Sequence, residues 1–269
     1  MGGPQETLLR LSIFIGVFAL LAVAEVFWPR RMQTFGRVRW IANLGLSVAN
    51  TALLRLSYLV VPALTVLAAA YGERNGWGLL PAVGLTGVAA AVIGVIALDL
   101  AIYGQHVAMH FVPTLWRLHR VHHADPDFDV STGIRLHPVE ILFSQVWKIA
   151  VVLVAGVPAV AVLAFEVVLN ATSMFSHANV RLPRGVDAVL RMLMVTPDMH
   201  RIHHSTVMDE TNSNFGFNLS LWDRLFGTYR REPMGEQTTM PIGLPSYRGG
   251  EPVRFFWLLG FPFARGPAA

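Results

Sequence analysis

Four stretches of this chain are apolar over lengths that soluble domains rarely contain. They cover residues 11–28, 41–70, 80–103 and 139–174. A helix that crosses the hydrocarbon core of a bilayer needs about 20 consecutive, mostly apolar residues. The composition agrees, because only 14% of the residues are charged, against about 25% in soluble domains. We therefore expect an all-α, multi-pass transmembrane helical bundle.

The apolar stretches differ in what they predict. The first lacks the basic start and cleavage site of a signal peptide, so we expect a span. The second contains Arg55 and is expected to be tilted or broken. The last is long enough for two short spans, and Gly156 and Pro158 in "GVP" favour a turn between them. The sequence thus predicts about four to five spans, one of them a hairpin.

The loop arginines predict an orientation in the membrane. The loop after the first span contains four of them, whereas the loop after the second balances Glu73 against Arg74. Because cytoplasmic loops carry the excess of arginine and lysine, we expect the first loop, residues 105–138 and residues 177–269 on the cytoplasmic side. Lys148 is the only lysine, so arginine is used almost everywhere in place of lysine. This preference, with abundant alanine and glycine, is typical of a GC-rich genome and favours a bacterial inner membrane protein. The four loop arginines are Arg30, Arg31, Arg37 and Arg39.

All ten histidines lie between residues 106 and 204. They form one HxxxH pair, "HVAMH", and two HxxHH triplets, "HRVHH" and "HRIHH". Residues at i, i+3 and i+4 share one helix face, so each box directs several imidazoles, which are good transition-metal ligands, to one point. One box is a weak signal, but three boxes hold more histidines than one four-coordinate ion uses. We expect two metal ions. The boxes contain His106, His110, His119, His122, His123, His200, His203 and His204.

The rest of the sequence narrows the chemistry. The absence of cysteine excludes disulfides, thiolate zinc sites and iron–sulfur clusters. There is no HExxH motif of hydrolytic zinc enzymes and no Glu-x-x-His pattern of soluble di-iron proteins. No long basic run supports nucleic-acid binding. What remains is a histidine-rich dinuclear site in a cytoplasmic helical cap, where iron activating O₂ could meet lipid from the bilayer and electrons from the cytosol.

Longer motifs around the boxes resemble a known family. "DLAIYGQHVAMH" (residues 99–110), "HRVHH" and "HRIHH" are similar to the three histidine boxes of the fatty acid hydroxylase superfamily, also called the sterol desaturase family, of membrane di-iron enzymes. "STGIRLHPVE", "FSHANV" and "NFGFNLSLWDRLFGTY" resemble its other segments. The resemblance covers about residues 95–230. Val107 and Ala178 depart from the family pattern without removing a histidine.

The resemblance implies an O₂-dependent non-heme di-iron monooxygenase that hydroxylates, or desaturates, a lipid C–H bond. It implies two iron ions, which zinc can replace in purified protein, and a separate electron donor such as a ferredoxin, or a cytochrome b5-like protein with its reductase. His137 is either a ligand or a hydrogen-bond donor, and Arg135, Glu140, Asp198 and Asp223 are candidates for orienting the ligands. The implied ligands are His106, His110, His119, His122, His123, His177, His200, His203 and His204.

Two other functions remain open. The same boxes occur in alkylglycerol monooxygenase-like ether-lipid cleavage, which uses a pterin donor. A membrane metal transporter or sensor is the alternative from another class. Transport ligands are expected near the bilayer midplane, whereas these boxes alternate with Arg117, Arg120 and Arg201, which disfavours transport. The sequence does not select the lipid.

We expect three regions along the chain. Residues 1–94 form an N-terminal transmembrane region, and residues 95–230 form the catalytic domain with its membrane hairpin. Residues 231–269 form a tail. Within the tail, the aromatic stretch at residues 254–266 is too short to cross a bilayer, so we expect it to anchor at the membrane interface.

Overall fold

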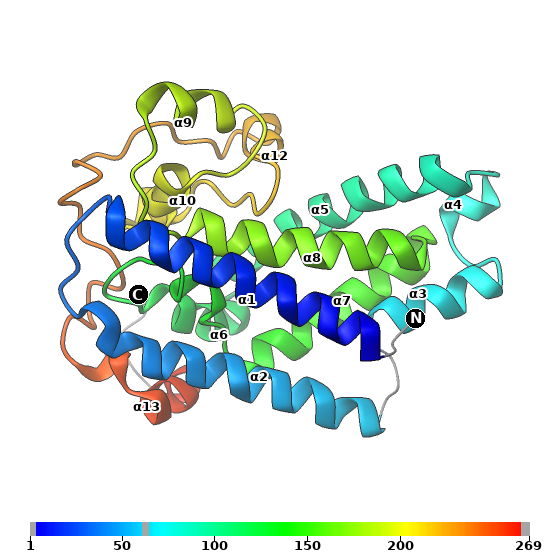
Figure 1. Ribbon diagram of the computed structural model, residues 1–269, viewed down its shortest axis with the longest axis horizontal. Helices are drawn as coiled ribbons and strands as arrows, with labels where there is room; N and C mark the ends of the chain where they lie inside the picture. Colours follow the sequence, from blue (N-terminus) through cyan, green and yellow to red (C-terminus); the bar gives the residue numbers. More distant parts are fainter. Residues whose placement is uncertain (1–3, 61–64, 265–269) are drawn as a thin grey trace.

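The structure, a computed structural model, describes residues 4–60 and 65–264. These residues form helices joined by loops, without a β-strand. Long helices lie side by side and form a bundle (Figure 1). Four of them, α1, α5, α7 and α8, are long and apolar enough to cross a membrane. The expected all-α, multi-pass membrane architecture is therefore confirmed. The long helices are α1 (Pro4–Phe27), α2 (Trp40–Val60), α5 (Gly87–Phe111), α7 (Pro138–Ala155) and α8 (Ala159–Ser176).

Shorter helices complete the chain. The α-helices are α3 (Thr65–Arg74), α4 (Leu79–Ala82), α6 (Pro113–His123), α9 (Arg184–Leu190), α10 (Pro197–His203), α11 (Met208–Thr211), α12 (Leu221–Leu225) and α13 (Phe255–Gly260). The 3-10 helices are η1 (Gly36–Arg39), η2 (Thr132–Ile134), η3 (Glu251–Val253) and η4 (Phe261–Phe263).

The second apolar stretch contains two helices, α2 and α3. The residues between them, 61–64, lie outside the described part of the chain. Within the described part, α2 is not among the four candidate spans. The expected tilt or break in this stretch stays a prediction, because the residues between α2 and α3 lie outside the described part of the chain.

The third span differs from its expected bounds of 80–103. Gly84 and Gly87 adopt positive φ angles, of 75° and 60°, so the short α4 is separated from α5 and the span begins later. The span also ends later, at Phe111. Polar residues such as Gln105 and His106 do not interrupt a helix, so α5 continues until Pro113 prevents its extension. The consequence matters for the site: the HxxxH pair belongs to the candidate span itself.

The predicted hairpin is present as α7 and α8. Gly156 ends α7 in the left-handed conformation, with φ of 74°. A side chain there would bring a Cβ atom within 2.6 Å of the Trp77 carbonyl oxygen and of Pro81 Cδ. Glycine is therefore required both for the turn and for the close approach of the 77–81 segment.

One end of the bundle gathers the helix ends that matter for the site. Figure 1 shows α6, α10 and α13 at this end, where α1 and α8 finish and α2 begins. We call α6 and the elements from α9 to α13, with their loops, the cap. The loop with the four arginines joins α1 to α2 at the same end. The predicted cytoplasmic location of this end stays a prediction.

Buried ion pairs fix the loop between α1 and α2 to the cap. Arg39 is fully buried and lies in ion-pair contact with Asp125, Asp127 and Asp129. Asp127 also accepts the backbone N–H groups of Thr34, Phe35 and Gly36 at 2.7–3.1 Å. A buried charge is tolerated only when it is paired and hydrogen-bonded, so this network gives the loop a single position.

The C-terminal aromatic segment packs on the cap and on α2. Leu258 and Phe261 are buried in one cluster with Leu46. Phe256 and Phe263 are exposed, by 81% and 66%. The predicted interfacial anchor is thus partly a packing element, and its membrane contact stays a prediction. Its last residues, 265 and 266, lie outside the described residues.

Candidate metal centre

Four segments bring the clustered histidines to the end of the bundle. The pair His106 and His110 lies in the last turns of α5, and Pro113 turns the chain back into α6, which carries the first triplet. The second triplet lies at the end of α10. His177 caps the C-terminus of α8. The hairpin of α7 and α8 therefore leads the chain away from this site and back to it.

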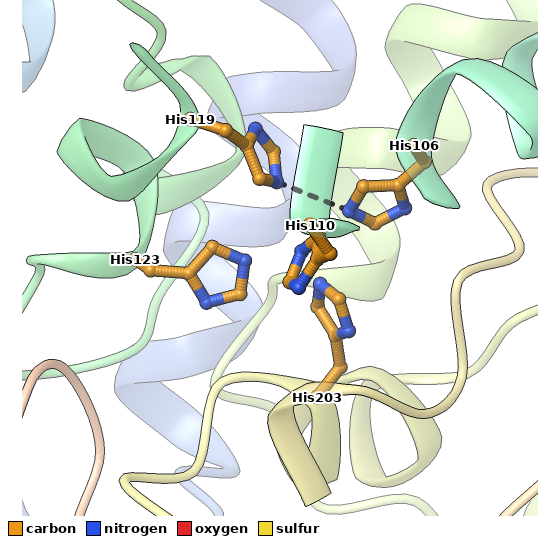
Figure 2. Close-up of side chains that lie close together, drawn as sticks. All are labelled: His106, His110, His119, His123 and His203. Atoms are coloured by element: carbon orange, nitrogen blue, oxygen red, sulfur yellow. Dashed lines mark hydrogen bonds between the residues drawn. The ribbon is translucent and has the colours of Figure 1, made fainter. Parts of the chain in front are cut away.

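These nine histidines form two groups. In each group the candidate ligand atoms, one per residue, lie within 4.8 Å of one another. Figure 2 shows the first group, with five rings directed toward a common centre. Both triplets contribute to both groups, which accounts for their near-identical sequences. The first group contains His106, His110, His119, His123 and His203, and the second contains His122, His177, His200 and His204.

Backbone carbonyl groups fix the tautomers of several rings. Nδ1 of His106 lies 2.7 Å from the carbonyl oxygen of Phe215, and Nδ1 of His203 lies 2.7 Å from that of Ser213. Nδ1 of His177 lies 2.6 Å from its carbonyl partner at position 173. Because a carbonyl oxygen only accepts, each of these Nδ1 atoms carries the proton. In a neutral ring the Nε2 atom then presents a lone pair.

The lone pairs of neighbouring rings face each other. Nε2 of His106 lies 3.1 Å from Nε2 of His119, and Nε2 of His177 lies 3.0 Å from Nε2 of His122. Two lone pairs form no hydrogen bond. Two imidazoles that bind one ion at right angles, with bonds of about 2.1 Å, place their nitrogens about 3 Å apart. The spacing therefore fits ligands that share a cation.

Further buried nitrogens support the same conclusion. Nε2 of His110, His123 and His203 is buried and has no hydrogen-bond partner among the described residues. Buried polar atoms in folded proteins nearly always have a partner. A metal ion in the first group would satisfy all three atoms, so the residues present fit the dinuclear centre that the sequence predicts.

Burial keeps the cap histidines neutral. It lowers the pKa of the His177 ring from 6.5 to about 4. In five histidines of the two triplets, burial holds the ring pKa well below 6.5, and the neighbouring imidazoles add to this effect. Neutral imidazole is the form that binds metal, so these rings are ready to bind at pH 7. The five are His122, His123, His200, His203 and His204.

A carboxylate orients one ring of the first group. Glu140, in the first turn of α7, lies with Oε1 2.7 Å from Nδ1 of His119. Metal-bound imidazoles normally donate their other N–H to a carboxylate or carbonyl oxygen. Glu140 is therefore placed for the orienting role that the sequence suggested, and its effect on metal binding stays a prediction.

Arg135 acts on the site through the backbone. Its carbonyl oxygen lies 3.2 Å from Nδ1 of His122. Its buried guanidinium group donates to the carbonyl oxygens of Val121 and Pro252 and to Oδ1 of Asn43. The arginine thus positions the carbonyl group that His122 contacts.

The two aspartate candidates differ. Asp198 contacts Arg30 and Arg201 rather than a histidine, so its carboxylate fixes the α1–α2 loop to α10. Asp223 accepts the backbone N–H groups of Phe215 and Gly216 at 2.7 and 2.9 Å. Asp223 therefore holds the loop whose carbonyl group accepts the His106 proton.

Comparison with known proteins agrees with this geometry. The family profile described as Fatty acid hydroxylase matches residues 91–228, about half of the chain, and this range contains all nine clustered histidines. The chain belongs to the fatty acid hydroxylase family.

The relatives of this fatty acid hydroxylase family member are lipid-modifying proteins by name. The chain is 30% identical over 174 residues to an ornithine lipid hydroxylase of Rhizobium tropici, which covers 65% of this chain and 50% of the relative. It is 29% identical over 138 residues to the alkylglycerol monooxygenase of Homo sapiens, covering 51% of this chain and 30% of the relative. The chain thus spans half or less of the length of these relatives. No solved structure matches it.

His137 lies outside both histidine groups of this family member. It precedes Pro138 at the start of α7, where its Nδ1 accepts the backbone N–H of Val139 at 3.2 Å. Its Nε2 lies 3.2 Å from the carbonyl oxygen of Leu259. Of the two roles considered from the sequence, the placement favours the hydrogen-bonding one, which connects α7 to the C-terminal segment.

Several partners of the histidines were not predicted from the sequence. Oδ1 of Asn212 lies 3.3 Å from Nδ1 of His110, and the neighbouring loop supplies the carbonyl groups of Ser213 and Phe215. In this loop Asn214 has a positive φ of 54°, and its side chain donates to the carbonyl oxygen of Met199. Asn214 begins the family-like motif at 214–229, which was the available signal, but a motif does not indicate which carbonyl oxygens face a ring.

Proposed function

We propose that this chain is a membrane-bound, non-heme di-iron oxidoreductase that uses O₂ to hydroxylate a C–H bond of a lipid. One observation carries the proposal: two adjacent groups of neutral imidazoles, with lone pairs directed inward, lie at the shared end of apolar helices. Membership of the fatty acid hydroxylase family supports the lipid chemistry. The same site could instead desaturate the lipid, which is the other reaction that the resemblance implies.

Each histidine group would hold one iron ion. Bound iron would supply the O₂-activating chemistry that side chains lack. The chain's own residues position the site: carbonyl oxygens of Phe215 and Ser213 hold the Nδ1 protons of His106 and His203, and Glu140 holds that of His119. Because these rings cannot rotate without losing a hydrogen bond, their Nε2 atoms stay directed at the ions.

The helices and the cap give access from two phases. The spans expose apolar side chains such as Ile96 and Val168, by 43% and 48%, so a lipid chain can approach within the bilayer. The clustered histidines are mostly buried, which keeps water from the reacting carbon. Electrons come from a separate protein, a ferredoxin or a cytochrome b5-like protein with its reductase. This donor would approach the cap from the cytoplasm.

Ether-lipid cleavage is a second candidate. It is favoured by the similarity to alkylglycerol monooxygenases of Homo sapiens and Xenopus tropicalis, at 29% and 28% identity over about half of this chain. Cleavage releases a fatty aldehyde, whereas hydroxylation leaves a lipid that is heavier by one oxygen atom. A pterin donor would be required for cleavage.

One labelling experiment tests the proposal. Cells with and without this chain are grown under ¹⁸O₂, and their lipids are compared by mass spectrometry. We expect a lipid that carries one ¹⁸O atom only when the chain is present. Release of a fatty aldehyde in its place selects ether cleavage, and an unchanged lipid profile under ¹⁸O₂ contradicts both functions.

Substitution of single ligands adds a second test. We expect His122→Ala and His203→Ala to abolish metal loading and turnover, because each removes an inward-facing nitrogen from one group. His137→Ala is the matched control, since this histidine lies outside both groups. Full activity with retained metal in His122→Ala or His203→Ala would contradict the site.

A further inference from the structure

A large apolar surface lies on the cap, outside the spans and the metal centre. Seven large apolar side chains in and beside α9 and α12 are 46–71% exposed. Monomeric soluble proteins rarely expose a continuous apolar patch of this kind unless it binds something. We call this surface the α9–α12 face: Val186, Val189, Met192, Leu193, Leu221, Leu225 and Phe226.

The two halves of the α9–α12 face are joined. The backbone N–H of Ser220 donates to the carbonyl oxygen of Leu193 at 3.2 Å. The Ser220 hydroxyl group and the Arg224 guanidinium group both donate to the carbonyl oxygen of Arg191, at 2.7 Å. The exposed side chains at 192–193 and at 221–226 therefore belong to one surface. Figure 1 shows α9 and α12 on the same side of the molecule.

This surface lies beside the membrane-crossing helices, not beyond their ends. Nε1 of Trp222 donates to Asp99 at 2.8 Å, and Phe226 stacks on Tyr103 with ring centres 5.4 Å apart. Asp99 and Tyr103 precede the last residue of α5, Phe111, by twelve and eight residues. At 1.5 Å per residue these positions lie about 18 and 12 Å back along the span.

A second candidate span contacts the same segment. The side chain of Asn218 contacts the hydroxyl group of Thr172. Thr172 lies four residues before the last residue of α8, Ser176, or about 6 Å back along that span. The segment that carries α12 therefore lies alongside the cap-side ends of two candidate spans, about 6 to 18 Å back from their last residues.

The α9–α12 face is bordered by an apolar surface on α5 and by two arginines near the start of α9. On α5, the spacing of Ile96, Leu100 and Tyr103 puts them on one side of the helix, and the first two are 43% and 38% exposed. At the other edge, Arg181 and Arg184 are exposed at the start of α9. Among the described residues neither has an acidic partner within ion-pair distance. Apolar side chains bounded by free arginines suit a phospholipid leaflet.

We propose that the α9–α12 face rests in the membrane leaflet next to the metal centre. Its apolar side chains enter the boundary between acyl chains and headgroups, while Arg181 and Arg184 contact lipid phosphate groups. The C-terminal segment also exposes aromatic side chains at this end of the bundle, Phe256 and Phe263. The leaflet contact holds the histidine groups at a fixed height above the acyl chains.

The absence of cysteine allows a direct test. Single cysteines are introduced by Met192→Cys and Leu225→Cys in the face, and by Met234→Cys as the matched control. Met192 and Met234 are both exposed cap methionines, by 60% and 64%, but Met234 lies outside the face. Each protein is spin-labelled in phosphatidylglycerol–phosphatidylethanolamine vesicles. Collisions with O₂, which enriches in lipid, and with a water-soluble nickel chelate are then measured.

We expect labels at 192 and 225 to be more accessible to O₂ than to nickel, and the label at 234 to show the reverse. Equal nickel access at all three positions would overturn the proposal. Protection from both reagents with spin–spin broadening would also overturn it, because a second copy of the chain would then cover the face. Helix content measured by circular dichroism checks folding. The result is independent of metal binding and turnover, so the proposed function is tested separately.

Discussion

At the level of single residues, the site depends on which nitrogen of each ring carries a proton. The carbonyl oxygens at positions 213 and 215 each accept a hydrogen bond from one ring of the first group, and Glu140 faces a third ring. The inward nitrogens are thereby left with lone pairs that a metal ion could bind. The side chains and carbonyl groups behind the histidines thus determine the chemistry as much as the histidines do.

Removal of the carboxylate behind His119 tests this account. We expect Glu140→Ala to weaken metal binding by about 10- to 100-fold, because the His119 ring loses the partner that orients it. Glu140→Gln keeps an oxygen acceptor and should lose less. Metal affinity is measured by competition with a chelator. Glu232→Gln, at an exposed position, is the control, and an affinity in Glu140→Ala equal to that of this control would contradict the role.

The buried histidines also predict a pH dependence. The folded-state pKa of His177 is about 4, below its ordinary 6.5, because burial disfavours the charged ring. As the pH falls below about 6.5 the unfolded chain binds this proton first, so the stability that His177 contributes is complete above that pH and is lost toward pH 4. We expect the metal-free protein to lose about 2 kcal/mol at pH 5 from this ring alone.

Thermal unfolding of the metal-free protein in detergent measures this effect. The unfolding temperature of the metal-free protein should decrease between pH 7 and pH 5. An unfolding temperature that is constant or rises over this range would show that the ring is not buried in its neutral form.

At the level of elements, the position of α8 depends on close contact with η2. A Cβ atom at Gly133 would lie 2.9 Å from the carbonyl oxygen of Ser173, the group that accepts the His177 proton. We expect Gly133→Ala to displace the end of α8 and to lower activity by about 10- to 100-fold. Gly185→Ala, where a Cβ atom meets open space, is the control. Activity and metal content are measured together, and wild-type values in Gly133→Ala would contradict the contact.

The sequence predicted the elements better than their contacts. Helical spacing predicted that each box directs several imidazoles to one point, whereas each triplet is divided between the two groups. "GVP" predicted the hairpin, because a turn depends on local geometry. The span 80–103 was placed too early, since a hydropathy pattern does not show that the helix continues through His106 and His110. The division of each triplet between two groups, and the carbonyl oxygens behind the rings, arise from long-range packing that no local pattern encodes.

For the whole molecule, the hairpin α7–α8 and the crossing of α5 bring distant histidines to one end of an apolar bundle. Buried ion pairs of Arg39 hold the cap on that end. The α9–α12 face and the C-terminal segment both belong to this end. In the proposed function, this arrangement would let a lipid in the bilayer reach the two histidine groups while a soluble electron donor reaches the cap.

The iron content of the folded protein tests the central claim most directly. The chain is loaded with ferrous iron without O₂, freed of unbound metal, and analysed for iron per chain. Two irons per chain are expected, one for each histidine group. A folded protein that is fully active with one iron per chain would contradict the dinuclear centre.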